Sequence, residues 1–303
     1  MDERQRRGLV EIMRENAHLN RAMSEHTTFR IGGKAEAVCF VRELGELQQL
    51  FAYLNKENIP YLVVGRGSNL LVKDGGFKGV VIIMRENLAT IEQHETNEEI
   101  LVVGGGLALS DLVKYCSQKG LGGLEFLAGI PGTVGGAVAM NAGAFGKDMG
   151  SVVQKIELLN RQGELISINR SELVFSYRKS SIQEGTIVVR ASLQGTRETA
   201  EIVSKKVTDY LTKRKATQPL EHPSAGSVFR NPPDDYAGRL IEETGLKGKK
   251  IGGAMISPQH ANYIVNTGGA RAEDVLALME MAKEKVKAQT GIDLEPEIMV
   301  VGD

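Results

Sequence analysis

The chain has 303 residues and very little cysteine. Cys39 and Cys116 are its only two cysteines, they lie far apart, and neither belongs to a CxxC pair. Disulfide-rich domains and structural zinc sites need several suitably spaced cysteines, so the sequence predicts neither. A reducing compartment, the cytoplasm, is expected. Both thiols lie in apolar segments, and we therefore expect them to be buried and inert.

The chain also has no large excess of positive or negative charge, because it contains 37 Lys and Arg and 38 Asp and Glu, for a net charge of −1. A nucleic-acid binder normally has a basic face, so no nucleic-acid partner is expected. The charged N-terminus does not read as a secretory signal. Residues 126–146 carry no charge, but their six glycines and Pro131 would make a poor helix, and we expect no membrane insertion.

Familiar nucleotide and metal motifs are missing as well. After an expected strand at 61–65, Gly65 and Gly67 begin a GxGxxG pattern whose third glycine position holds Leu70. A P-loop at Gly146 would need glycine at 141, where the chain has Asn141. There is no GxSxG, no HExxH and no i, i+4 histidine pair. The sequence therefore predicts no Rossmann site and no metal.

Glycine is abundant, with 35 residues that cluster without a repeat. Two glycine-rich turns stand out, GRGSNLL at 65–71 and AGIPGTVGGAVAMNAGAFG at 128–146. Such turns can present a row of backbone N–H groups to phosphate oxygens, and the second can lead into a helix N-terminus. Tight turns and close packing explain the same glycines equally well, and the residues alone leave both interpretations open.

Short apolar runs between turns predict an α+β fold rather than a doubly wound parallel sheet. Helices are expected over the first 20 residues and over 43–59, 109–119 and 198–214. The expected strands are 35–41, 61–65, 79–84, 99–106, 152–160, 164–168 and 186–193.

The chain changes character near residue 200, where we place a domain boundary between 1–200 and 201–303. Four of the eight prolines fall in residues 216–235, which is either a linker or a rigid loop carrying a site. Beyond it the pattern predicts a strand at 262–266 and a last strand at 292–301. A helix between them has one apolar stripe, made of Val275, Leu278, Met279, Ala282 and Val286.

The motifs support a resemblance. VGRGSNLL followed by AGIPGTVGGAVAMNAGAFG resembles the FAD-binding domain of vanillyl-alcohol-oxidase-type and p-cresol-methylhydroxylase-type flavoproteins. FSYRKS (175–180), AGSVFRNP (225–232) and LEPEIMVVG (294–302) follow in order. From about His26 to the C-terminus, the chain resembles the UDP-N-acetylenolpyruvoylglucosamine reductase family of peptidoglycan precursor synthesis.

This resemblance implies a two-lobed FAD-binding domain with a core over about 28–195, split near 75–80, and a smaller C-terminal α+β substrate-binding domain. It implies noncovalent FAD, NADPH as reductant, and a UDP-sugar enol ether as substrate. We expect a monomer or weak homo-oligomer. The short spacing between Arg178 and Arg190 matches the subclass without an extra tyrosine-bearing loop.

By position, Arg178 is the family's arginine for the substrate carboxylate, Ser227 its proton donor and Glu297 its catalytic acid, in preference to Glu295. A neutral hydroxyl can protonate a carbanion-like centre, and a guanidinium fork suits a carboxylate. Alternation places Glu297 on the polar face of the last strand, and Pro296 confines that strand to an edge or bulge. Taken alone, these residues would be read as a surface ion pair, a turn serine and a solvated acidic face.

The remaining expected site residues have supporting roles. Expected to bind FAD are Gly65, Arg66, Gly67, Ser68, Asn69, Leu70, Gly129, Pro131, Gly132, Thr133, Gly135, Gly136, Ala137, Gly143 and Ala144. Expected to bind substrate or shape its pocket are Tyr177, Arg214, Lys215, Gln218, Asn231, His260 and Asn262. Met299 stands where many relatives have a basic residue, which removes a cationic contact there.

Two other functions compete with this reading. A flavin oxidase or dehydrogenase of the same superfamily would share the glycine turns but would not need the set of Ser227, Arg178 and Glu297. A non-catalytic nucleotide-binding module would tolerate the replacement of Ser227 by alanine.

Overall fold

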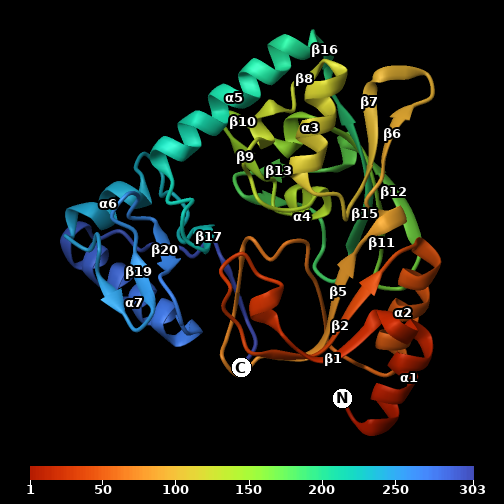
Figure 1. Ribbon diagram of the computed structural model, residues 1–303, viewed down its shortest axis with the longest axis horizontal. Coiled ribbons are helices and arrows are strands. Elements are labelled where there is room, and N and C mark those ends of the chain that lie inside the picture. The colour runs from red at the N-terminus through yellow and green to blue at the C-terminus, as the bar shows by residue number, and fades with distance from the viewer. The chain divides into compact units, whose positions relative to one another are not determined.

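The computed structural model describes all 303 residues (Figure 1). The chain forms two compact units, each assembled from several segments. The first unit contains residues 1–19, 37–65 and 79–212, and the second contains 20–36, 66–78 and 213–303. The expected division into continuous domains at residue 200 stays a prediction. No helix combines the length and the apolar character needed to cross a bilayer.

The N-terminal part of the chain builds a four-stranded sheet in the order β1–β2–β5–β3. Its strands are β1 (Ala17–Ala22), β2 (Lys34–Val41), β5 (Phe77–Met84) and β3 (Tyr61–Val63). Helices α1 (Glu3–Met13) and α2 (Leu44–Lys56) accompany it. In α2 the residues Leu47, Leu50, Phe51 and Leu54 recur at helical spacing and are all buried.

The expectation of a helix over the first 20 residues is wrong beyond Met13. Arg14 has a positive φ of 49°, which ends α1, and residues 17–22 become strand β1. Half of β1 is exposed, so it has no clear alternation of apolar residues. Its pairing with β2 is a long-range event that a local pattern does not encode.

A five-stranded antiparallel sheet lies in the first unit, in the order β12–β11–β15–β7–β6. The strands are β6 (Ile91–His94), β7 (Asn97–Gly104), β11 (Val153–Leu159), β12 (Leu165–Asn169) and β15 (Ile187–Gln194), so four expected strands are confirmed and β6 was missed. Its core also includes α3 (Leu109–Lys119) and α4 (Val134–Ala139). Cys116 is buried there, and Cys39 is buried in β2.

Several very short strands pair locally. They are β9 (Gly143–Ala144) with β10 (Lys147–Asp148), β13 (Phe175–Ser176) with β14 (Lys179–Ser180), and β8 (Leu121–Gly122) with β16 (Thr196–Arg197). Single 3₁₀ turns occupy Arg14–Asn16, Met23–Glu25, Glu86–Leu88, Glu125–Leu127, Met149–Ser151 and Arg170–Glu172. Helix α5 (Ala200–Thr217) confirms the helix expected at 198–214.

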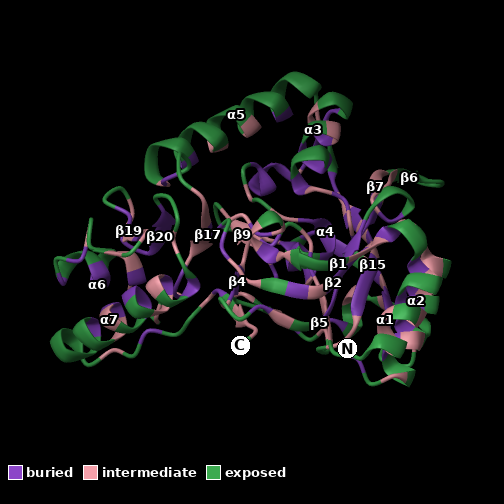
Figure 2. Ribbon diagram, turned by 60° about the horizontal axis from the view of Figure 1, so that its bottom comes forward, coloured by how far each residue is buried: buried purple, intermediate pink, exposed green.

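The second unit has a four-stranded sheet, β17 (Ser224–Ser227), β20 (Tyr263–Asn266), β19 (Ala254–Ile256) and β18 (Lys250–Ile251), in that spatial order. Helices α6 (Ala237–Glu243) and α7 (Ala272–Thr290) lie beside it (Figure 1). The whole predicted stripe of α7 is buried, and Figure 2 shows its opposite face exposed. Periodicity alone was sufficient to identify this helix and its inner face.

The last strand is shorter than expected. Only Met299–Val301 forms a strand, β21, which pairs in parallel with β4 (Leu70–Val72). Before it, residues 292–298 are irregular apart from an isolated bridge between Pro296 and Phe229. Pro296 has no N–H to give to a ladder, which explains why regular pairing starts only beyond it.

Candidate functional site

The first glycine turn connects β3 to β4. Gly67 is buried with φ +59°, and a Cβ built on it would lie 2.3 Å from the carbonyl oxygen of His26 and 2.8 Å from Thr27 Cα. None of the backbone hydrogen bonds outside the helices and strands uses the N–H of Arg66 or Gly67. Only glycine fits at position 67, and the turn has backbone donors available for an anion.

The second glycine tract contains two kinds of glycine. The N–H groups of Val134 and Gly135 donate to Leu107 and Gly105 at 2.9 Å and 2.8 Å, so they are used within the fold. A Cβ on Gly135 would lie 3.0 Å from the carbonyl oxygens of Gly105 and Val188, which assigns this glycine to close packing. Gly136, by contrast, is exposed, and its Cβ would meet only Thr133 Oγ1, at 3.6 Å. Both interpretations of the tract therefore apply, each to different glycines.

The two glycine-rich segments touch each other within the first unit. A Cβ on Gly65 would lie 2.4 Å from Thr133 Oγ1, and Thr133 is buried directly before α4. Gly129, Pro131 and Gly136 of the second segment are exposed. The backbone amides of Arg66 and Gly67 in the first turn fit a pyrophosphate group such as that of FAD.

Arg178 lies at the tip of a two-residue hairpin loop between β13 and β14. Its φ is +55°, a left-handed conformation that is uncommon for a side chain of this size. The guanidinium carbon lies 5.1 Å from the ring centroid of Tyr177, which is exposed. Strained backbone of this kind is frequent at functional sites.

The hairpin is anchored to the end of the second glycine tract. Ser180 donates its hydroxyl to the carbonyl of Ala139 at 2.7 Å, and Asn141 donates its side-chain amide to the carbonyl of Ser176 at 2.8 Å. Asn141 is fully buried and also accepts from the N–H of Gly150. The glycine tract and the arginine hairpin therefore form one connected piece of the first unit.

Ser227 ends strand β17 and follows Gly226, whose φ is +78°. The next two residues are tightly fixed by Asn262. Its carbonyl accepts from the N–H of Val228 at 2.9 Å, and its side-chain amide exchanges two hydrogen bonds with the backbone of Phe229, at 2.9 Å and 2.8 Å. The backbone beside the serine is therefore rigidly held.

Glu297 lies on the segment next to the serine. Its N–H donates to the carbonyl of Val228 at 2.8 Å, and its carbonyl accepts from the side-chain amide of Asn69 at 3.1 Å. Asn69 belongs to the first glycine turn, and its own carbonyl accepts from Met299 at 2.9 Å. The second unit thus joins Ser227, Glu297 and the first glycine turn, whereas Arg178 belongs to the first unit.

The other carboxylates of the last segment have cationic partners. Asp293 pairs with Lys287 at 2.8 Å, and the exposed Glu295 pairs with Arg230 at 3.9 Å. These pairs account for Asp293 and Glu295 as charged surface residues. Glu297 is half-buried, and its N–H is bonded to the carbonyl of Val228 in the segment that follows Ser227.

Three expected substrate residues lie at the C-terminal end of α5. Arg214 is buried and donates to Oε1 of Gln218 at 3.2 Å. Lys215 is exposed, and its carbonyl accepts from the side chain of Gln259 at 3.2 Å. A buried arginine at the end of a helix is a stronger anion-binding candidate than the exposed lysine beside it.

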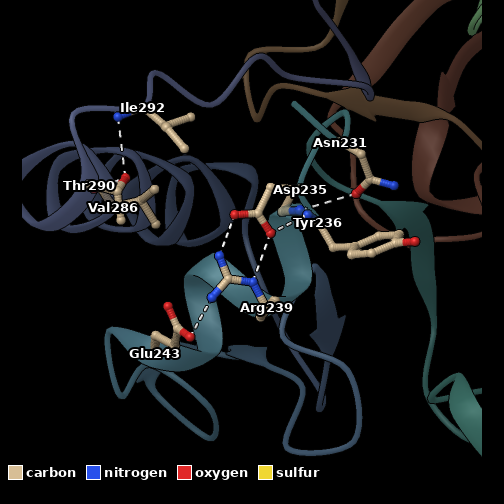
Figure 3. Close-up of polar contacts among 9 residues, drawn as sticks. Asn231, Asp235, Tyr236, Arg239, Glu243, Val286, Thr290 and Ile292 are labelled. Carbon is tan, nitrogen blue, oxygen red and sulfur yellow. Dashed lines mark hydrogen bonds and ion pairs between the residues drawn. The ribbon is translucent and has the colours of Figure 1, made fainter. Parts of the chain in front are cut away.

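His260 and Asn231 shape the backbone around them. Burial lowers the pKa of the His260 imidazole, whose Nδ1 accepts from the N–H of Asn262 at 3.2 Å. Asn231 Oδ1 accepts from the N–H of Ala237 at 3.1 Å at the start of α6 (Figure 3). The same view shows Arg239 between Asp235 and Glu243 on the surface of that helix.

Sequence reasoning missed several residues that hold this site. Thr28 donates its hydroxyl to the carbonyl of Ser224 at 2.7 Å and its N–H to Gly67 at 3.3 Å, so it links the glycine turn to the serine strand. No motif marks Thr28. Asn141 lies within the quoted glycine tract, and an asparagine among glycines that adopts a positive φ is a usable signal.

Two family domains and many relatives match this chain. Residues 35–169 match the FAD binding domain family, and residues 218–301 match the C-terminal domain of UDP-N-acetylenolpyruvoylglucosamine reductase. The chain is 45% identical over 288 residues to the reductase of that name from Anoxybacillus flavithermus, covering 93% of each chain. It is 42% identical to that of Caldanaerobacter subterraneus, covering 97% of each.

Solved structures give the same result. The crystal structure of UDP-N-acetylenolpyruvylglucosamine reductase from Thermus caldophilus matches with a TM-score of 0.81 at 38% identity, covering 94% of this chain and 98% of that one. A VAO-type flavoprotein from Myceliophthora thermophila matches at 11% identity with a TM-score of 0.51, covering 98% of this chain and 63% of that one, which shows a shared fold. The expected fold class, an α+β FAD-binding domain of this type with a C-terminal domain, is confirmed.

Proposed function

Because this chain belongs to the UDP-N-acetylenolpyruvoylglucosamine reductase family of FAD-dependent oxidoreductases, we propose that it reduces UDP-N-acetylenolpyruvoylglucosamine to UDP-N-acetylmuramate. NADPH is the reductant, and the product serves peptidoglycan precursor synthesis in the cytoplasm. The observation that carries the proposal is the 2.8 Å hydrogen bond from the N–H of Glu297 to the carbonyl of Val228. Because Val228 directly follows Ser227, the two predicted catalytic residues, Ser227 and Glu297, lie on neighbouring segments.

The two glycine-rich turns hold FAD noncovalently in this proposal. The amides of Arg66 and Gly67 in the first turn serve its pyrophosphate. In the second segment, the exposed Gly129 and Gly136 let a ligand approach the backbone closely. When bound, FAD supplies the hydride that reduces the vinyl group. Gly135 belongs to the same segment but acts through packing. Residues 1–200 provide the cofactor domain and 201–303 the substrate domain.

Each predicted catalytic residue has one task. Hydride addition to the terminal vinyl carbon leaves negative charge on the adjacent carbon and its carboxylate. The Ser227 hydroxyl donates the proton that this carbon takes up. Arg178 binds the carboxylate through its fork of N–H donors, and the Glu297 side chain stabilises the developing charge. Arg214 and Gln218 contact the substrate diphosphate. The enzyme works as a monomer or weak homo-oligomer.

A stopped-flow experiment that separates the two half-reactions tests the proposal. Ser227→Ala is expected to leave flavin reduction by NADPH nearly intact and to slow reoxidation by the enolpyruvyl UDP-sugar by ~10²–10⁴-fold, the usual effect of losing an acid or base. Glu297→Gln is expected to affect the same half-reaction with unchanged FAD content. Ser224→Ala, on the same strand, is the matched control and should affect neither.

The competing functions give different results. A wild-type flavoprotein that the enolpyruvyl UDP-sugar does not reoxidise, and that an alcohol or sugar acid reduces in place of NADPH, would be a flavin oxidase or dehydrogenase. A colourless protein without flavin absorbance would be a non-catalytic module. Equal loss of both half-reactions in Ser227→Ala would indicate a damaged fold and would contradict the role of this serine.

A further inference from the structure

We infer that two asparagines, Asn262 and Asn69, are positioning residues for substrate reduction, and that they fix Ser227 and Glu297 through one continuous chain of hydrogen bonds. Neither side chain is proposed to touch the reacting atoms. The inference rests on the proposed roles of Ser227 and Glu297, and it adds the residues that hold their backbones in place.

The chain of hydrogen bonds starts at Asn262, whose side chain is almost fully buried, at 3% exposure. Its side-chain amide acts as a two-pronged clamp, with Oδ1 accepting from Phe229 N–H and Nδ2 donating to Phe229 C=O. Its main-chain carbonyl takes the N–H of Val228. Three hydrogen bonds from one residue therefore fix the two positions after Ser227.

The next link is Val228 itself. While its N–H is held by Asn262, its carbonyl accepts the N–H of Glu297 at 2.8 Å. The bridge between Phe229 and Pro296 lies alongside. Any shift of the serine segment is therefore transmitted directly to the backbone of Glu297.

The last link is Asn69 in the first glycine turn. Its Nδ2 donates to the carbonyl of Glu297, and its own carbonyl accepts from Met299, so it holds the backbone on both sides of Ile298. The N–H and the C=O of Glu297 are thus both bound, one to the serine segment and one to the turn. Neither Pro296 nor the irregular stretch before it can supply this rigidity through a regular ladder.

This arrangement has a chemical consequence. A proton donor and a charge-stabilising acid act efficiently only when both are held in the reactive geometry, and a displacement of about 1 Å can cost about 10²-fold in rate. Loss of either asparagine amide should therefore reduce the rate of substrate reduction much more than it reduces binding of FAD or NADPH.

The experiment uses the FAD-loaded full-length protein and three variants. Asn262→Leu removes the clamp while keeping a similar volume, and Asn69→Asp replaces the donor to Glu297 by a charged carboxylate oxygen of similar size. Asn266→Leu is the matched control, because Asn266 is a buried asparagine at the end of strand β20, which Asn262 directly precedes, and its side chain bonds to Phe29, Gly268 and Ala270 instead.

We expect Asn262→Leu and Asn69→Asp to slow single-turnover reoxidation by the enolpyruvyl UDP-sugar by about 10- to 100-fold. Flavin reduction by NADPH in Asn262→Leu should stay within about twofold, because both side-chain amide groups of Asn262 are bonded to the backbone of Phe229. Asn266→Leu should lower stability while leaving the ratio of the two half-reactions unchanged. Reoxidation at the wild-type rate in Asn69→Asp, or equal slowing of both half-reactions in it, would overturn the inference.

Amide hydrogen exchange provides a readout that needs no substrate. Removing the clamp should increase exchange at Phe229, whose N–H loses its acceptor, Asn262 Oδ1. It should also increase exchange at Val228 and Glu297, which keep their backbone acceptors but lie on a segment that is no longer held by the clamp. If Asn262→Leu does not fold, Asn69→Asp alone decides the matter through exchange at Glu297 and Met299. If the wild-type protein fails to reduce the sugar nucleotide, the proposed function falls, while unchanged exchange in the variants is what would refute the hydrogen-bonded chain.

Discussion

Gly65 and Thr133 lie so close together that a Cβ on the glycine would be 2.4 Å from the threonine Oγ1. They belong to the two glycine-rich segments, which are far apart in the sequence and come together at this point. The absence of a side chain at residue 65 therefore lets one glycine-rich segment lie directly against the other.

Replacing Gly65 by alanine should push these segments apart. We expect the clash to destabilise the protein by about 1–3 kcal/mol, as overpacking usually does, and to lower its FAD content. Thr133→Ala removes Oγ1 and the methyl group, so the double variant should recover part of that loss. A double-mutant cycle on urea stability should show a coupling of at least about 0.5 kcal/mol. Strict additivity would mean that the two segments do not touch.

Gly67→Ala should destabilise the protein more than Gly65→Ala does, and no substitution of a neighbouring side chain should restore its stability. The added Cβ would meet the main-chain oxygen of His26, in a residue whose φ is +59°. We expect loss of FAD absorbance after purification. Gly45→Ala is the control, because the exposed Gly45 in α2 has no neighbour within 4 Å of the added atom. A yellow Gly67→Ala protein with wild-type flavin content would contradict the assigned role of this turn.

Asp74 should contribute measurably to stability through helix α7. The residue before the helix is Arg271, whose side chain has no acceptor. Instead the Asp74 carboxylate accepts from the N–H groups of Ala272 and Glu273 at 2.9 Å and 3.0 Å. Asp74→Ala should cost about 1 kcal/mol in urea unfolding, as loss of a helix cap does. Glu280→Ala on the exposed face of α7 should cost much less, and equal effects would refute the cap.

The two thiols should be unreactive in the folded protein. Burial raises the pKa of both Cys39 and Cys116 to about 12, so almost no thiolate is present near pH 8. Iodoacetamide at that pH should modify neither cysteine until denaturant is added, as intact-mass spectrometry would show. Rapid labelling of either thiol in the native protein would show that its segment opens.

His260 should make the protein less stable in mild acid. Burial lowers the pKa of its imidazole in the folded state, and protonation also removes the Nδ1 acceptor used by Asn262. Since the unfolded chain binds the proton more readily, this contribution to stability is complete above about pH 6.5 and is lost as the pH falls through the folded-state pKa. His260→Gln should flatten the decline of urea midpoints between about pH 6.5 and pH 5. An unchanged dependence of the urea midpoint on pH in the variant would show that His260 does not cause the decline.

Most of the fold could be predicted because the decisive information was local. The buried stripe of α7 and four strands of the five-stranded sheet, all except β6, follow from the spacing of apolar residues. Strand β1 could not be predicted, because half of it is exposed and it exists only through its pairing with β2. The last strand was predicted to be too long, because the alternation of apolar and polar residues continues through Pro296, whereas backbone pairing with a neighbouring strand does not.

The amino-acid sequence by itself determined which chemical groups are available and where the backbone must bend. Motif order identified the glycine turns, Ser227 and Glu297, and glycine permits a positive φ wherever it occurs. Tertiary structure alone decided that Asn69 bonds to Glu297, that Asn262 bonds to the two residues after Ser227, and that Gly135 is closely packed while Gly136 is exposed. The physical reason is that hydrogen bonds and steric contacts between distant segments depend on distances in space, and no local pattern of residues encodes those distances.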